Sequence, residues 1–200
     1  MDLKPFLDIA SSDHKHLCPR QILGVRIGLK GMAVLGFDAS STPKHLLVIS
    51  ETDGCFIDGV IAVTKCTVGH RNLRVEDYGK IAATFVNTKT NQSFRIAPAV
   101  DVREQAMIYA PEEKRHYFVQ MQAYQIMPDE ELMNVQEVVL NLSVDELISH
   151  SGKRVRCEGC GEEIMNEREV VIEGKVYCKS CAEGGYYQVA KTNFPFHNHS

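Results

Sequence analysis

The amino-acid sequence predicts an α+β fold: a mixed core of helices and strands over residues 1–150, then a small cysteine-rich unit over 151–200. Helix and strand patterns follow one another in the first 150 residues without strict βαβ alternation, which disfavours a parallel α/β fold. From Ser151 to Ala182 the chain is poor in large aliphatic residues and rich in cysteine, glycine and charge. This change of composition places a domain boundary near Ser149–Lys153.

The elements of the predicted core are read from periodicity and turn signals. A helix is expected from Pro19 onward, because apolar residues recur at helical spacing and Cys18 then takes the N-cap position before a proline at the first helical position. The polar turn TKTNQ between two strand-like runs predicts a β-hairpin. The full set of expected elements, in chain order, is a helix from Pro19, a strand over His45–Thr52, a helix over Phe56–Thr64, a hairpin of Gly79–Asn87 and Ser93–Ala97, helices over Val102–Ala110 and Glu112–Tyr124, a helical turn from Pro128, and a last strand over Val135–Leu142.

Composition excludes several classes of protein. Hydrophobic residues make up 44% and charged residues 24%, which is ordinary for a globular chain. No apolar run approaches the ~18–20 residues that a membrane span needs, and the first residues lack the apolar region of a signal peptide. We therefore expect a cytoplasmic protein without a membrane partner. The formal net charge of −4 argues against nucleic acid as a partner.

Seven cysteines are an unusual number for such a chain. A reducing compartment disfavours disulfides, and an odd number cannot pair completely. Metal binding or thiol chemistry is the usual use of cysteines in this setting.

The clearest motif consists of two C-x-x-C pairs, Cys157 with Cys160 and Cys178 with Cys181, separated by 17 residues. This spacing is typical of a structural zinc site, in which four sulfurs close a tetrahedral shell. A hairpin signal at Glu173-Gly174 and a short helical turn after Cys178 indicate a treble-clef-like finger. A redox dithiol or an iron–sulfur site is the alternative.

A second candidate site lies at the start of the chain, where His14, His16 and Cys18 alternate and lead into a helix N-terminus. Alternating side chains of an extended segment point the same way, and a helix N-terminus stabilises a thiolate. The three residues are therefore candidates for metal ligation, or for catalysis by a thiol with a neighbouring base. The alternative is a solvated loop with two surface histidines and a buried cysteine.

Further candidates for lining this site lie later in the core: Cys55, Asp58, Cys66 and Lys80. Core packing is the alternative for both cysteines, because free cysteine is often buried. Lys80 offers a cation to an anionic ligand, or it is simply a lysine at the edge of a hairpin. The histidines of the tail, His197 and His199, have no role that the sequence decides.

Two blocks of this sequence resemble the E-subunit family of formylmethanofuran dehydrogenases. The first is His14-x-His16-x-Cys18-Pro19-x-x-x-Leu23-Gly24-x-Arg26-x-Gly28. The second runs from Glu51-Thr52-Asp53-x-Cys55-x-x-Asp58 through Thr64-x-Cys66-Thr67-x-Gly69-x-x-Asn72-Leu73 to Asp77-Tyr78-Gly79-Lys80. Lys15 and Arg20 stand where the family usually has glycine, so they add positive charge and bulk beside the site. A four-cysteine finger after this core is also a known family arrangement.

The resemblance implies an α+β core, homodimers, and a metal or thiol site, but no particular reaction. It points to an accessory subunit of a molybdenum or tungsten enzyme, which other subunits of a dehydrogenase complex would accompany, rather than to its pterin-bearing subunit. We expect a zinc-binding protein with a structural zinc in the finger and a second metal in the core, held by His16, Cys18 and Cys55 with His14 and Cys66 nearby. The alternatives are a stand-alone enzyme that uses Cys18 as nucleophile or redox thiol with His14 or His16 as base, and an interaction or regulatory module that acts through the finger.

Overall fold

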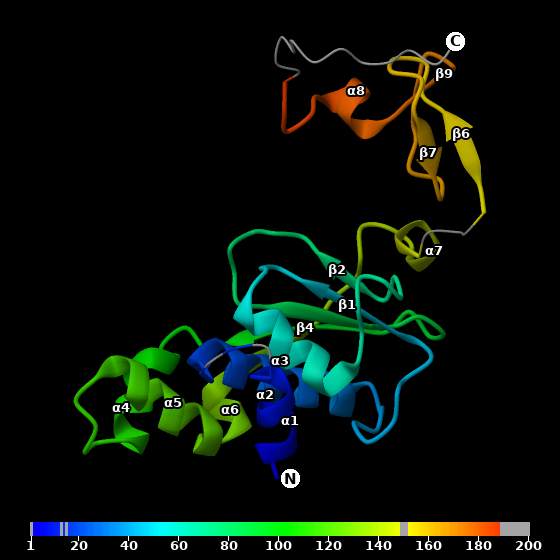
Figure 1. The fold of residues 1–200 in the computed structure, drawn as a ribbon. Helices are drawn as coiled ribbons and strands as arrows, with labels where there is room; N and C mark the ends of the chain where they lie inside the picture. The colour runs from blue at the N-terminus through cyan, green and yellow to red at the C-terminus, as the bar shows by residue number, and fades with distance from the viewer. Residues whose placement is uncertain (1, 13, 15, 149–151, 189–200) are drawn as a thin grey trace. The chain divides into compact units, whose positions relative to one another are not determined.

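The computed structural model describes residues 2–12, 14, 16–148 and 152–188 (Figure 1). The chain divides into two compact units, Met1–Val144 and Asp145–Ser200. The predicted boundary at Ser149–Lys153 falls a few residues later, and its residues 149–151 lie outside the described part, as do Lys15, His197 and His199.

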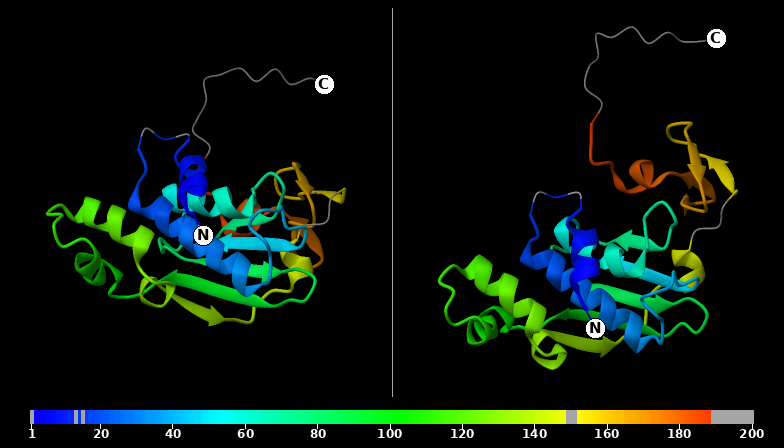
Figure 2. Two further views of the ribbon diagram at one scale, coloured as in Figure 1. Left: turned by 90° about the horizontal axis from the view of Figure 1, so that it is seen from below. Right: turned by 60° about the horizontal axis from the view of Figure 1, so that its bottom comes forward.

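Three helices lie on one face of the sheet in the first unit: α1 (Lys4–Ala10), α2 (Pro19–Val34) and α3 (Cys55–Thr64) (Figures 1 and 2). Helix α2 begins at Pro19 with Cys18 as its N-cap, which confirms the prediction. Helix α1 was not predicted, because its seven residues are too few for a clear periodic pattern.

Glycines allow α2 and α3 to touch at the backbone. A Cβ on Gly24 would lie 2.2 Å from the carbonyl oxygen of Phe56, and a Cβ on Gly59 would lie 2.2 Å from the carbonyl oxygen of Gln21. One turn further along α2, Gly28 faces Val63. Because later residues of α2 meet later residues of α3, the two helices run in the same direction and begin at the same end.

The sheet of the first unit has five strands in the order β2-β1-β3-β4-β5. Strand β1 pairs in parallel with β2, and the other pairings are antiparallel. Strands β3 and β4 form the predicted hairpin. The short β2, packed beside β1, was missed. The bounds are β1 Leu46–Ser50, β2 Leu73–Val75, β3 Ala83–Asn87, β4 Ser93–Pro98 and β5 Met133–Glu137.

A second group of helices consists of α4 (Val102–Tyr109), α5 (His116–Ile126) and α6 (Asp129–Leu132). Arg26 fixes this group to α2, because its guanidinium donates hydrogen bonds to the carbonyl oxygens of Tyr124 (2.8 Å) and Met127 (2.7 Å) and to the carboxylate of Asp129 (2.8 Å). Helix α5 begins four residues later than predicted, because the side chain of Glu113 accepts hydrogen bonds from the N–H groups of Lys114 and Arg115 in a turn. With helices and a mainly antiparallel sheet, the α+β class is confirmed.

The second unit is built of two small hairpins and a short helix. Glu173 (φ 52°) and Gly174 (φ 78°) are both left-handed, as the predicted tight turn requires. The bounds in this unit are β6 Arg154–Arg156, β7 Glu163–Met165, β8 Val170–Ile172, β9 Lys175–Tyr177 and α8 Lys179–Glu183, with α7 (Val144–Leu147) at the division between the units. Within the described residues, no helix is long and apolar enough to cross a membrane.

Candidate functional site

The structure brings the four finger cysteines together. The sulfur atoms of Cys157, Cys160, Cys178 and Cys181 all lie within 4.8 Å of one another. Gly159 fits closely here, since a Cβ at this position would lie 3.1 Å from the sulfur of Cys181. Four thiolates at this spacing suit the tetrahedral coordination of Zn²⁺, and no position is left open for a substrate. The finger therefore supports one structural zinc.

Backbone groups prepare this cluster for a metal. The N–H of Cys178 donates a hydrogen bond to the sulfur of Cys157 at 3.2 Å. That bond and the N–H groups of Cys160 and Gly159 lower the pKa of the Cys157 thiol to about 6. The neighbouring thiols of Cys178 and Cys157 raise the pKa of Cys181 to about 12. A divalent cation removes this mutual repulsion, since coordination deprotonates the thiols.

In the first unit, the N-termini of α2 and α3 place two cysteines side by side. Cys18 is the N-cap of α2, and Cys55 is the first residue of α3. Their thiols are in hydrogen-bonding contact. Burial raises the pKa of the Cys55 thiol, and the neighbouring Cys18 and Asp58 raise it further, against a smaller opposite effect of Arg20.

A histidine and a carboxylate complete this core cluster. Nε2 of His14 lies 2.8 Å from a carboxylate oxygen of Asp58, which is one turn beyond Cys55 on α3. The ligand atoms of His14, Cys55 and Asp58 all lie within 4.8 Å of one another. Residues from two separate parts of the sequence therefore meet at one point, with donor atoms of three kinds.

The position of Cys18 is fixed by a buried glutamine. Gln21 is fully buried, and its side-chain oxygen accepts a hydrogen bond from the N–H of Cys18 at 2.9 Å. Its side-chain nitrogen donates to the carbonyl oxygen of Ala10 at 2.6 Å. Gln21 thus ties the end of α1 to the N-cap of α2.

The predicted grouping of ligands needs two corrections. His16 is exposed, and His14 rather than His16 meets Cys55, because the backbone bends at both histidines instead of remaining extended. Cys66 lies beyond the other end of α3, fully buried in the hydrophobic core, with its sulfur near the carbonyl oxygen of Leu46 (3.9 Å). Burial raises the pKa of its thiol to about 11, so the core-packing alternative describes Cys66.

A cleft of about 1130 Å³ opens beside the two thiols. Lys80 lines it, as the sequence suggested, together with residues that no sequence pattern selects. Among its lining residues are Cys18, Arg20, Cys55, Lys80, Arg103 and Tyr124. In the sequence Arg20 stands out only as a departure from the family pattern, and nothing marks Arg103 or Tyr124, which come from α4 and α5.

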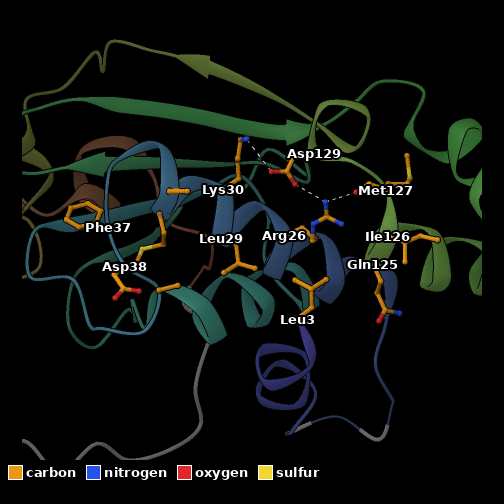
Figure 3. A pocket seen from close by; sticks show the side chains of 13 residues that line it. Leu3, Arg26, Leu29, Lys30, Phe37, Asp38, Gln125, Ile126, Met127 and Asp129 are labelled. Atoms are coloured by element: carbon orange, nitrogen blue, oxygen red, sulfur yellow. Dashed lines mark hydrogen bonds and ion pairs between the residues drawn. The ribbon is translucent and has the colours of Figure 1, made fainter. Parts of the chain in front are cut away.

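Another cavity of about 510 Å³ lies along α2, away from the thiols (Figure 3). Leu3, Leu29 and Phe37 give it an apolar wall. Its cations are already paired, since Asp129 lies 2.8 Å from Arg26 and 3.2 Å from Lys30. These contacts hold α6 against α2, so a structural role accounts for the charged groups of this cavity.

Comparison with known proteins gives two family matches. Residues 14–148 match the family described as FmdE, Molybdenum formylmethanofuran dehydrogenase operon. Residues 151–187 match the Prokaryotic dksA/traR C4-type zinc finger.

Two individual proteins are similar to the chain. A Probable S-adenosyl-L-methionine-binding protein of Archaeoglobus fulgidus is 30% identical over 202 residues, which are 90% of this chain and 53% of that protein, so the chain spans about half the length of this relative. The crystal structure of an FmdE-like protein of the tungsten formylmethanofuran dehydrogenase type, from Syntrophus aciditrophicus, has a TM-score of 0.56 at 20% identity, over 94% of this chain and 96% of that one. This second likeness concerns the fold. The family match covers well over half of the sequence, including both cysteines at the helix N-termini, and the chain therefore belongs to the FmdE family, with a C4-type zinc finger after its core.

Proposed function

We propose that the core of this FmdE-family protein binds a divalent metal ion, zinc by the chemistry of its donors, through His14, Cys55 and Asp58. The observation that carries the proposal is the approach of the three ligand atoms to within 4.8 Å of one another. Ligands around a tetrahedral zinc ion are about 3.5 Å apart, so small rotations of the side chains close the shell. This core site would be distinct from the closed site of the finger.

The donor set fits a reactive rather than a structural site. Imidazole nitrogen, thiolate sulfur and carboxylate oxygen are all established zinc ligands, and three protein ligands leave a fourth position for water or substrate. The side chains of His14 and Asp58 are 41% and 35% exposed, so this position is open to solvent. An ion held there would supply a Lewis acid. Cys18, in contact with Cys55, either completes the shell or remains a free thiol beside it.

Metal analysis of the purified full-length chain tests the proposal. We expect about two zinc ions per wild-type chain, about one in a Cys55→Ser variant, and about one in a Cys178→Ser variant. Cys66→Ser is the matched control, because it removes a thiol from the hydrophobic core and should leave both ions in place. A wild-type chain with a single ion that only Cys178→Ser removes would contradict the core site. Unchanged metal in Cys18→Ala would remove Cys18 from the ligands.

A thiol enzyme is the second candidate, and the contact between His14 and Asp58 favours it. A histidine that is oriented by a carboxylate and lies near a cysteine is the arrangement of a nucleophile with its base. This function requires a thiol at Cys55 or Cys18 that is more reactive than an ordinary one. Alkylation of metal-free protein with iodoacetamide decides the question, since rates equal to those of an unfolded peptide cysteine would exclude this role.

Association with other proteins remains a proposal as well. Apolar side chains on α4 and α5 are exposed in the single chain, including Met107 (53%), Ile108 (69%) and Phe118 (41%). We propose that a second copy of the chain, or another subunit of a formylmethanofuran dehydrogenase, covers them. Sedimentation equilibrium of the purified protein tests the dimer, and a monomer at every concentration would contradict it. Retention of the chain by nucleic acid at low salt would point instead to the regulatory role of the finger.

A further inference from the structure

We propose that the cleft beside Cys18 and Cys55 binds a small organic anion, a carboxylate or a phosphate ester with an apolar body, and that Tyr124 and Arg103 hold its anionic group. The proposal rests on the proposed function, because the bound molecule would present its reactive part to the metal or thiols of the core. It goes further by assigning the chemical class of that molecule and the residues that recognise it.

Tyr124 supplies the first observation. The residue is 1% exposed, yet it lines the cleft, and among the described residues its hydroxyl has no hydrogen-bond partner. Buried polar groups are nearly always paired, so a hydroxyl of this kind indicates a missing partner. Burial raises the pKa of Tyr124, so its hydroxyl stays protonated and can donate to an acceptor. An oxygen atom of a ligand would satisfy it.

The charges of the cleft supply the second observation. Arg103 lies near Tyr124 and influences its ionisation, while Arg20 and Lys80 line other parts of the cleft. None of these three cations has an ion pair within the described part of the chain. Glu104 is the unpaired acid of the lining, so positive charge predominates and an anion is favoured.

The remaining arginine of the cleft shows the contrast. Arg95 is paired through two hydrogen bonds with the buried Glu51, at 2.5 and 2.7 Å, so its charge is already compensated. The other three are therefore the groups that a ligand would neutralise. The N-termini of α2, α3 and α4 also border the cleft, through Pro19, Cys55 and Val102, and their dipoles add to the attraction for an anion.

Size and apolar lining define the rest of the molecule. Small-molecule sites usually measure about 300–1,000 Å³. At about 1130 Å³ this cleft accommodates a molecule much larger than a single phosphate or carboxylate group. Leu23, Ile81 and Val102 give it apolar surface. A simple inorganic anion would leave that surface uncovered.

Binding of three matched probes to the full-length protein tests the proposal: phenyl phosphate, 3-phenylpropionate, and the neutral alcohol 3-phenylpropan-1-ol. In titrations followed by ligand-observed NMR, we expect at least one anion to bind about tenfold or more tightly than the alcohol. A preference for phenyl phosphate would assign a phosphate ester, and a preference for 3-phenylpropionate a carboxylate. Both anions binding no better than the alcohol would overturn the proposal.

Substitutions then locate the binding. Tyr124→Phe keeps the ring and removes the hydroxyl, and we expect about tenfold weaker binding of the preferred anion, with a similar loss for Arg103→Gln. Lys89→Gln is the control, since it removes one positive charge from the turn between β3 and β4, outside the cleft. Unchanged affinity in both cleft variants, or an equal loss in Lys89→Gln, would overturn the assignment. Arg103 is exposed, so its variant should fold even if Tyr124→Phe does not.

The two proposals can fail separately. If wild-type protein holds a core metal and neither anion outcompetes the alcohol, only the anion site is wrong. If a single zinc ion is found and the anions still bind through Tyr124 and Arg103, the core metal is wrong and the cleft stands. Titration of the Cys55→Ser variant provides the second comparison directly.

Discussion

Gly24 of α2 and Gly59 of α3 lie against each other's backbone, with their neighbouring carbonyl oxygens only 2.2 Å from where a Cβ would stand. No flexible side chain can move aside at this crossing, because the obstructing atoms are main-chain atoms. The contact holds the two helices at the distance that brings Cys18 and Cys55 together.

Gly24→Ala should therefore destabilise the protein strongly. Overpacking usually costs about 1–3 kcal/mol, and we expect about 3 kcal/mol or more here because two helices must separate. Chemical denaturation measures the free energy of unfolding. Gly69→Ala is the control, since a Cβ at that position meets nothing within 4 Å, and its effect should be small. Similar losses in both variants would contradict the close-contact explanation.

Removing the carboxylate of Asp129 should weaken the attachment of α6 to α2. Burial opposes the ionised form, but hydrogen bonds from Arg26 and Lys30 outweigh it, and the pKa of Asp129 is lowered below its ordinary value of 3.8. A lowered pKa stabilises the fold above pH 3.8, and this contribution is lost as the pH falls through the folded-state pKa. We expect Asp129→Asn to cost about 1–2 kcal/mol at pH 7, a modest value because the carboxylate is 39% exposed.

The pH series provides the check on Asp129. Thermal unfolding of wild type and Asp129→Asn should converge at acidic pH, where the carboxyl group is protonated. A difference in stability that stays constant from pH 7 to strongly acidic solution would show that the ion pairs are not its cause.

Glu51→Ala should be among the most destabilising single changes in the core. Glu51 is 8% exposed, and the substitution leaves the guanidinium of Arg95 without its partner. Breaking a buried ion pair costs about 3–5 kcal/mol, and the partial exposure of Arg95 places the expected loss near the lower value. The double variant Glu51→Gln with Arg95→Met removes both charges and should recover part of the stability. A double variant less stable than Glu51→Ala would contradict this account.

A zinc chelator should unfold the finger and leave the core folded. The second unit has few buried apolar side chains, with Cys157 and Ile164 among them, so metal coordination supplies much of its stability. In two-dimensional NMR, the methyl signals of Val171 and Ile172 should move to random-coil positions, while those of Val48 and Ile96 stay in place. Dispersed signals from Val171 and Ile172 after complete zinc removal would contradict a structural role for the metal.

The sequence predicted elements well where a local signal fixes the backbone. Proline after Cys18 fixed the start of α2, TKTNQ fixed the hairpin of β3 and β4, and the spacing of Cys157, Cys160, Cys178 and Cys181 indicated the finger. Helix α1 and strand β2 were missed because each is short and is stabilised by its neighbours rather than by its own pattern.

The core site was predicted in composition but not in arrangement. His14, Cys55 and Asp58 were all candidates, yet the choice between His14 and His16 depends on bends that alternation cannot reveal. Cys66 was grouped with Cys55, although ten residues of helix carry it to the opposite end of α3. Arg103 and Tyr124 reach the cleft only through the tertiary packing of α4 and α5, for which no local signal exists.

The glycine contact between α2 and α3 also determines where the chain can change in length. Each residue inserted into a helix rotates everything on one side of it by about 100° relative to the other. An insertion between Cys18 and Gly24, or between Cys55 and Gly59, would turn a thiol away from its neighbour while leaving the crossing intact. The turn between β3 and β4 carries no such constraint and should accept extra residues. Natural relatives that keep the site should therefore vary in length at this turn and hold the intervals from each thiol to its glycine fixed at six and four residues.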